Sequence, residues 1–170
     1  MRRGGTILII GLIASASACT KEATPPPPSP TPTPTATDAR ASFIALYETA
    51  CSAIASAGAG IEQPAQDGGT SPPSPPAEAL DAWATWARAL EQVHGSLVSA
   101  IQALPAPPKK ADAAANLVAL RDAATEAIGA IASRAEAGDR DGFSEAFSDW
   151  VAAGHDAGVA EERFGIRCDA

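Results

Sequence analysis

The sequence predicts an all-α fold, a four-helix bundle, and three observations support this class. Alanine accounts for 41 of the 170 residues, and alanine has the highest intrinsic helix propensity. Aromatic residues, which favour strands together with β-branched ones, make up only 5% of the chain. Four stretches carry apolar residues at helical spacing, and segments rich in proline and glycine separate them. A chain of this length is expected to form one such domain.

The residues before this domain, 1–18, predict a signal peptide. Arg2 and Arg3 give the chain a positively charged start, and a short apolar run follows over 7–13. The run is too short to span a bilayer, which takes about 20 residues. A positive start, a short apolar run and small residues at a cleavage site are typical of secretory signal peptides.

The segment Ala16-Ser17-Ala18-Cys19 resembles the lipobox of bacterial lipoproteins. In that family the cysteine sulfur receives a diacylglyceryl group. The resemblance therefore implies that Cys19 is a lipid attachment site and that the protein is extracytoplasmic, anchored to the bacterial cell membrane. Most lipoboxes have leucine where this chain has Ala16. Because small residues at 16 and 18 also suit a general signal peptidase, a secreted soluble protein is the alternative.

Residues 19–37 predict a lipid-anchored linker rich in proline and threonine. Seven of the 15 prolines lie in it, and it has no large apolar residue that could join a core. Proline-rich chain favours extended polyproline II at about 3.1 Å per residue, so the linker reaches on the order of 55 Å. It would hold the helical domain, 38–170, away from a membrane surface.

The first predicted helix of the domain spans 38–57. Asp38 is its expected N-cap, and the glycines at 58 and 60 are its expected end. Apolar side chains recur on one face at spacings of four, four and three residues. This face holds Phe43, Tyr47, Cys51 and Ile54.

A loop follows over 58–76, which is long for a helical bundle, where connections of about 2–8 residues are usual. The second predicted helix spans 77–104, with Ser74 as its expected cap and prolines in its first turn. Its apolar positions alternate spacings of three and four, so they form a heptad seam. The seam holds Leu80, Trp83, Ala87, Leu90, His94, Leu97, Ile101 and Leu104.

The third predicted helix begins between Pro108 and Asp112 and ends before Gly138. The fourth starts at Asp139 or Asp141 and ends near Phe164, where Gly165 suits a left-handed terminating turn. Each of these two helices has an apolar face with small residues, which allow close helix packing. The face of the third helix holds Leu117, Leu120, Ala124, Ile128, Ile131 and Ala135. The face of the fourth helix holds Phe143, Phe147, Trp150, Gly154, Ala157 and Phe164.

Two cysteines, Cys51 and Cys168, remain after Cys19 is assigned to lipid, and they predict one disulfide. Disulfides persist in exported proteins, and an even remainder of two leaves one natural pair. Free thiols, with Cys51 as a small buried residue, are the alternative.

This disulfide also predicts the order of the helices. Cys51 lies late in the first helix, and Cys168 lies beyond the end of the fourth. The bridge then needs the C-terminal ends of these two helices to be close together. We therefore expect the first helix to run parallel to the second and the fourth, with the loop 58–76 climbing beside the bundle. The alternative is the plain up-and-down order with the first helix slid or broken.

Motifs that carry chemistry are sparse. Glu91 and His94 form Glu-x-x-His, a spacing that di-iron bundles use twice, but His155 has no matching glutamate. We expect no cofactor, no metal and no catalytic residue, and we expect Trp83 and Trp86 to pack in the core rather than stack on sugars. A metal-binding or enzymatic bundle that uses Glu91 and His94 is the alternative.

The domain resembles small alanine-rich helical extracytoplasmic lipoproteins of high-GC bacteria. The residues behind this resemblance are the turn at Gly138-Asp139 and the closing segment Phe164-Gly165-Ile166-Arg167-Cys168. The resemblance implies no particular activity. A net charge of −8 argues against nucleic acid as a partner. We therefore predict a non-catalytic, lipid-anchored module that binds an envelope protein or a ligand.

Overall fold

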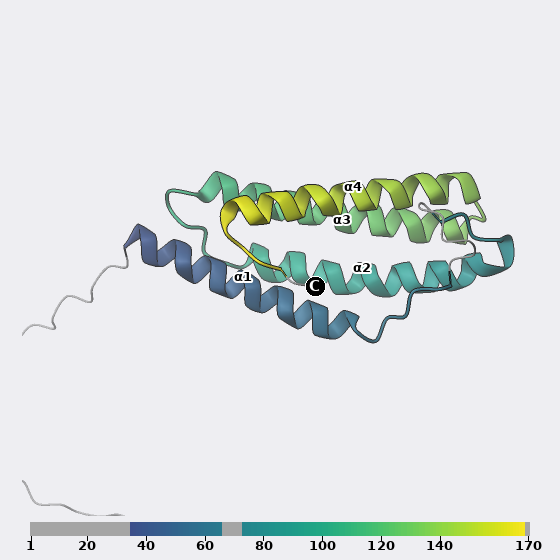
Figure 1. The fold of residues 1–170 in the computed structure, drawn as a ribbon, viewed down its shortest axis with the longest axis horizontal. Helices are drawn as coiled ribbons and strands as arrows, with labels where there is room; N and C mark the ends of the chain where they lie inside the picture. Colours follow the sequence, from purple (N-terminus) through teal and green to yellow (C-terminus); the bar gives the residue numbers. More distant parts are fainter. Residues whose placement is uncertain (1–34, 66–72, 169–170) are drawn as a thin grey trace, which may run out of the picture. The chain divides into compact units, whose positions relative to one another are not determined.

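The computed structural model describes residues 35–65 and 73–168. The regular structure of these residues is helical, without a strand among them, and they belong to one compact unit, Thr33–Ala170 (Figure 1). The all-α four-helix bundle is confirmed. The predicted signal peptide, the lipid site Cys19 and most of the linker lie outside the described residues. The helices are α1 (Ala36–Gly58), α2 (Leu80–Gln102), α3 (Ala111–Glu136) and α4 (Arg140–Phe164), with a short 3-10 turn, η2 (Ala77–Ala79), before α2.

The ends of the helices follow from local hydrogen bonds. The Thr35 hydroxyl accepts from the Asp38 backbone N–H at 3.2 Å, while the Asp38 carboxylate accepts from the Thr35 N–H at 3.0 Å. Asp38 therefore stands third in the first turn of a capping box and is not the N-cap that the sequence predicted. The predicted cap Ser74 is also wrong, because η2 follows Pro76 without a side-chain cap. Asp139 does cap α4, accepting from the Gly142 N–H at 3.0 Å.

The directions of the helices correct the predicted topology. Near the start of α1, Phe43 packs against Phe164 at the end of α4, with 5.3 Å between ring centroids. One turn further along α1, the Tyr47 hydroxyl bonds to Glu161, which lies earlier in α4. The two helices are therefore antiparallel, and the expected parallel pairing of the first helix with the fourth is wrong.

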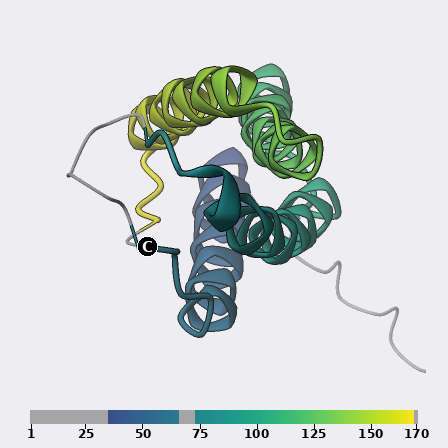
Figure 2. The same cartoon turned by 90° about the vertical axis from the view of Figure 1, so that its right-hand side faces the viewer.

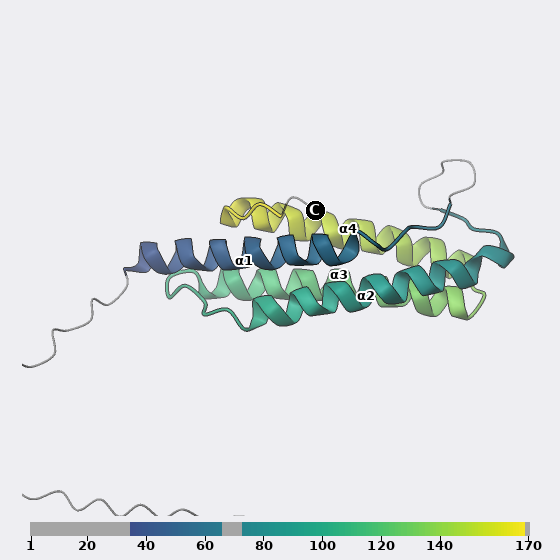
Figure 3. The same ribbon diagram turned by 90° about the horizontal axis from the view of Figure 1, so that it is seen from below.

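The first two helices are antiparallel as well, which is the plain up-and-down order. Leu90 lines a cleft with Gly58 at the end of α1, whereas Ile101 lines a hollow with Phe43 near its start. Figures 1 and 3 show α1 displaced along the bundle, so that it ends beside the middle of α2. The described start of the long connection, residues 60–65, lies beside α2, where it lines a hollow with Ala82, Thr85 and Trp86.

A reversal at the end of α4 explains why the cysteines meet in this order. Gly165 adopts a left-handed conformation, with φ of 93°, and the Ile166 N–H bonds back to the Glu161 carbonyl at 2.9 Å. The last residues then run back along α1 from Phe43 toward Cys51. That is about 12 Å of helix, and four extended residues span about 13 Å. The predicted parallel order failed because it assumed that the chain continues in the direction of α4.

The buried side chains form two clusters along the bundle, and only one of them includes α1. At the end where α2 and α4 begin, which faces the viewer in Figure 2, α2, α3 and α4 enclose a cluster of edge-to-face aromatic rings. Trp83 and Trp86 are buried in it, so both pack in the core. The second cluster lies toward the start of α1 and holds Phe43, Tyr47, Cys51, Leu97, Ile101, Ala114, Leu117, Phe164 and Ile166.

Candidate functional site

A buried polar network lies beside the second cluster, where α1, α3 and α4 meet. Glu161 is the buried charged residue of the described chain, with 3% of its surface exposed. Its carboxylate accepts from the Tyr47 hydroxyl and from the Nε and Nη2 groups of Arg121, each at 2.6 Å. The Arg121 pairing uses both carboxylate oxygens, which is the strongest arrangement for this ion pair. The network therefore connects three helices through one satisfied carboxylate.

The environment shifts the pKa values of both partners of Glu161. Burial raises the pKa of Tyr47, and its hydrogen bond to the Glu161 carboxylate raises it further. Burial opposes the charge of Arg121, but the hydrogen bonds and charge of Glu161 outweigh this and raise the pKa of Arg121. Tyr47 thus keeps its proton and Arg121 its charge across the physiological range.

The predicted disulfide lies directly beside this network. Cys51 and Cys168 are joined with 5.5 Å between their Cα atoms. Their sulfurs and a Glu161 carboxylate oxygen lie within 4.8 Å of one another, and this is the one group of potential metal ligands found among the described residues. Because the sulfurs are bonded to each other, neither is a thiolate, the form that binds metal.

The disulfide also forms part of the wall of a cleft between α1 and α2. The cleft has a volume of about 280 Å³ and is largely apolar. Two polar side chains reach it, and the charge of one of them, Arg121, is balanced by Glu161. We call it the His94 cleft, and its lining includes Cys51, Ile54, Ala55, Leu90, Val93, His94, Leu97, Arg121 and Cys168.

His94 is the polar side chain of this cleft that has no charged partner. Its Nδ1 atom is buried and has no hydrogen-bond partner within 35–65 and 73–168. The accessible polar edge of the ring is therefore at Nε2. Burial lowers the pKa of His94, and the nearby charge of Arg121 lowers it further, so the imidazole is neutral at pH 7. A neutral imidazole can donate to or accept from a ligand hydroxyl.

The Glu91 carboxylate is paired with Arg88, although the sequence had paired Glu91 with His94 in the metal-binding alternative. The Glu91 carboxylate accepts from the Arg88 guanidinium at 2.9 Å, and the same guanidinium pairs with Glu136 at 2.9 Å. Glu91 also lies against α3, where a Cβ atom at Gly129 would come within 2.5 Å of its carboxylate oxygen. Within the described ranges, Glu91 and His94 have no third His, Cys, Asp or Glu close enough to complete a metal site.

Two members of the buried network, Arg121 and Glu161, were missed by the sequence analysis although a signal was present. Glu161 lies four residues after Ala157 and three before Phe164, so it continues the buried face of its helix. Arg121 likewise lies four residues after Leu117 and three before Ala124, two positions on the apolar face of its own helix. A cation and an anion that interrupt two buried faces indicate a paired buried charge.

Comparisons of the chain with known proteins found no relative. No protein-family model, curated protein or solved structure matches the chain. In the described part of the chain, none of the helices combines the length and the apolar character needed to cross a bilayer.

Proposed function

We propose that this protein is a lipid-anchored, extracytoplasmic module that is non-catalytic and binds a small, mostly apolar ligand in the His94 cleft. The observation that carries the proposal is the cleft itself, with apolar walls from two helices and one neutral imidazole. Clefts of this composition bind ligands by burying apolar surface and orienting one polar group. The disulfide supports this role because it holds the tail, and with it Cys168, as a fixed wall.

The chemistry of the cleft favours an uncharged ligand with one hydroxyl group. Because Glu161 balances the charge of Arg121, the cleft offers no free cation to an anionic ligand. His94 is neutral, so it favours a group that can both donate and accept a hydrogen bond. A volume of about 280 Å³ suits a ligand of one or two rings.

The test compares two probes, 1-naphthol and naphthalene, which differ by one hydroxyl group. We expect 1-naphthol to bind the purified full chain saturably and more tightly than naphthalene. His94→Phe should remove most of that preference while keeping the apolar contacts. Intrinsic probe fluorescence measures both affinities.

Two leucine substitutions on α1 locate the binding. Ala55 lines the cleft, so Ala55→Leu should fill it and weaken 1-naphthol binding by about tenfold. Ala53 is exposed on the same helix and lines no part of the cleft, so Ala53→Leu is the matched control. Equal affinities in the two variants, or unsaturable binding to the wild type, would refute binding in this cleft.

The anchor is supported by the lipobox-like segment ending at Cys19 and has its own test. The mature protein should be heavier than the chain from Cys19 by a diacylglyceryl group, and it should partition into detergent. Cys19→Ser should release it from the membrane fraction or leave it unprocessed. A soluble wild type with an unmodified Cys19 would refute the anchor without affecting the cleft.

A further inference from the structure

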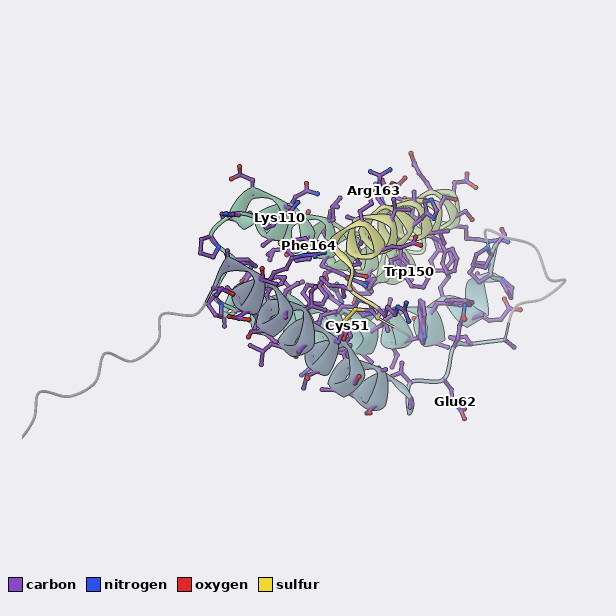
Figure 4. The ribbon with its side chains drawn as sticks, turned by 60° about the vertical axis from the view of Figure 1, so that its left-hand side comes forward. Cys51, Glu62, Lys110, Trp150, Arg163 and Phe164 are labelled. Atoms are coloured by element: carbon purple, nitrogen blue, oxygen red, sulfur yellow. A yellow bond between two sulfur atoms is a disulfide. The ribbon has the colours of Figure 1, made fainter. Side chains whose placement is uncertain are left out.

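A pocket separate from the His94 cleft lies at the end of the bundle where α1 and α3 begin and α4 ends. Its volume is about 280 Å³. Figure 4 shows Lys110, Arg163 and Phe164 together at this end of the bundle. We call it the basic pocket, and its lining includes Arg40, Lys110, Asn116, Leu117, Arg163 and Phe164.

The charge of the basic pocket is opposite to that of the chain. Acidic residues outnumber basic ones by 20 to 12 in the sequence, yet three cations and no carboxylate line this pocket. The carboxylates nearest in sequence, Asp38, Asp112 and Glu162, are exposed and are not part of the lining. The pocket is therefore a concentrated positive site on an acidic protein.

The three cations are available to a ligand. Within the described ranges, the side chains of Lys110 and Arg163 make no hydrogen bond and no ion pair, whereas Arg88, Arg121 and Arg134 are all ion-paired. Arg40 is held in place, because one of its amino groups donates to the Phe164 carbonyl and its guanidinium lies 5.7 Å from the centroid of the Phe164 ring. An arginine has five N–H donors, so Arg40 retains others.

The N-terminal end of α3 lies at the pocket. Lys110 is the N-cap residue of α3. Its side chain makes no capping hydrogen bond to the first N–H groups of this helix. The C-terminal end of α4 also lies at the pocket. Its last carbonyls accept from Arg40, Gly165 and Ile166.

We propose that the basic pocket binds a phosphate-bearing anion. Guanidinium groups pair with phosphate oxygens through two parallel hydrogen bonds, and a lysine adds a mobile positive charge. Leu117 and Phe164 give the pocket an apolar side for the carbon part of such a ligand. The proposal stands on these residues and does not depend on the His94 cleft or on the lipid anchor.

Two sources of this phosphate group are to be distinguished, a phospholipid headgroup and a free organic phosphate. The pocket lies at the end of the bundle where α1 begins, immediately after the capping residue Thr35. If Cys19 carries lipid, this is the end that the linker joins to the membrane. The headgroup source therefore rests on the proposed anchor, whereas the free phosphate does not.

The experiment uses two double variants that remove the same charge. Lys110→Gln with Arg163→Gln alters the pocket. Lys109→Gln with Arg167→Gln is the matched control, because both residues are exposed neighbours outside the lining. Glycerol 3-phosphate binding to the full chain is measured by calorimetry. Sedimentation of the full chain carrying Cys19→Ser is measured with vesicles of phosphatidylglycerol and phosphatidylcholine, against phosphatidylcholine alone.

We expect the pocket variant to lose about tenfold in affinity and the control variant less than about twofold. Such a loss on anionic vesicles supports the pocket with a headgroup as source. The same loss for glycerol 3-phosphate, when the wild type does not sediment with anionic vesicles, supports the pocket with a free organic phosphate as source. Equal losses in the two double variants would show general attraction and overturn the proposal, as would the absence of saturable binding to either probe.

Discussion

Replacing Glu161 with glutamine tests the buried network most directly. Glu161→Gln keeps the size of the side chain and an acceptor for the Tyr47 hydroxyl, but it removes the negative charge opposite Arg121. The Arg121 side chain is 15% exposed and that of Glu161 is 4% exposed, so water replaces little of the lost interaction. Breaking a buried pair by removing one partner costs about 3–5 kcal/mol. We expect the free energy of unfolding to fall by about 3 kcal/mol, with a decrease in Tm of about 10 °C.

The assay is urea denaturation followed by far-ultraviolet circular dichroism, with Glu136→Gln as the matched control. Glu136 pairs with Arg88 on the surface, where both side chains are at least 44% exposed, so the control should leave the denaturation midpoint unchanged. Adding Arg121→Met to Glu161→Gln should recover part of the loss, because it removes the unpaired buried charge. A loss under about 1 kcal/mol for Glu161→Gln, or a double variant that is simply additive, would refute the role assigned to this ion pair.

Three further predictions concern pH and redox state. Because the pKa of Tyr47 is raised in the folded protein, the unfolded chain releases its phenol proton first, so stability should fall as pH rises above about 10. Tyr47→Phe should flatten this alkaline decline in the denaturation midpoint, and an unchanged decline would contradict the prediction. Because the pKa of His94 is lowered, the unfolded chain binds a proton first, and stability should fall as pH drops below about 6.5; His94→Phe should reduce this acid sensitivity. Reduction of Cys51–Cys168 should cost up to about 5 kcal/mol while helicity is retained; a Tm equal in reduced and oxidised protein would show that the bridge contributes nothing.

The positions of the helices were accessible from the sequence because they depend on local signals. Prolines and glycines bound each apolar stretch, and the heptad seam of α2 places Leu80, Trp83 and Ile101 on its buried face. The pairing of Cys51 with Cys168 was accessible by counting the cysteines that remain once Cys19 is assigned to the predicted lipid site. The left-handed turn at Gly165 was also predicted, but its consequence for the path of the tail was not.

The candidate sites were less accessible, because each is formed by residues far apart in the sequence. His94 was recognised as a seam position, but its role in a cleft depends on how far α1 is displaced along α2. Arg121 and Glu161 stood in the sequence as interruptions of two apolar faces, and only packing shows that they meet. The basic pocket gathers Arg40, Lys110 and Arg163 from three helices, and no spacing along the chain relates them.

By itself, therefore, the sequence determined the fold class, the helices and the disulfide, since these depend on propensity, periodicity and composition within short windows. Only the tertiary structure decided the antiparallel order, because a single turn at Gly165 reverses the chain and lets Cys168 reach Cys51 from the opposite direction. The displacement of α1 likewise follows from side-chain packing between helices. That displacement places the last turn of α1 beside Leu90 and His94, and so forms the cleft.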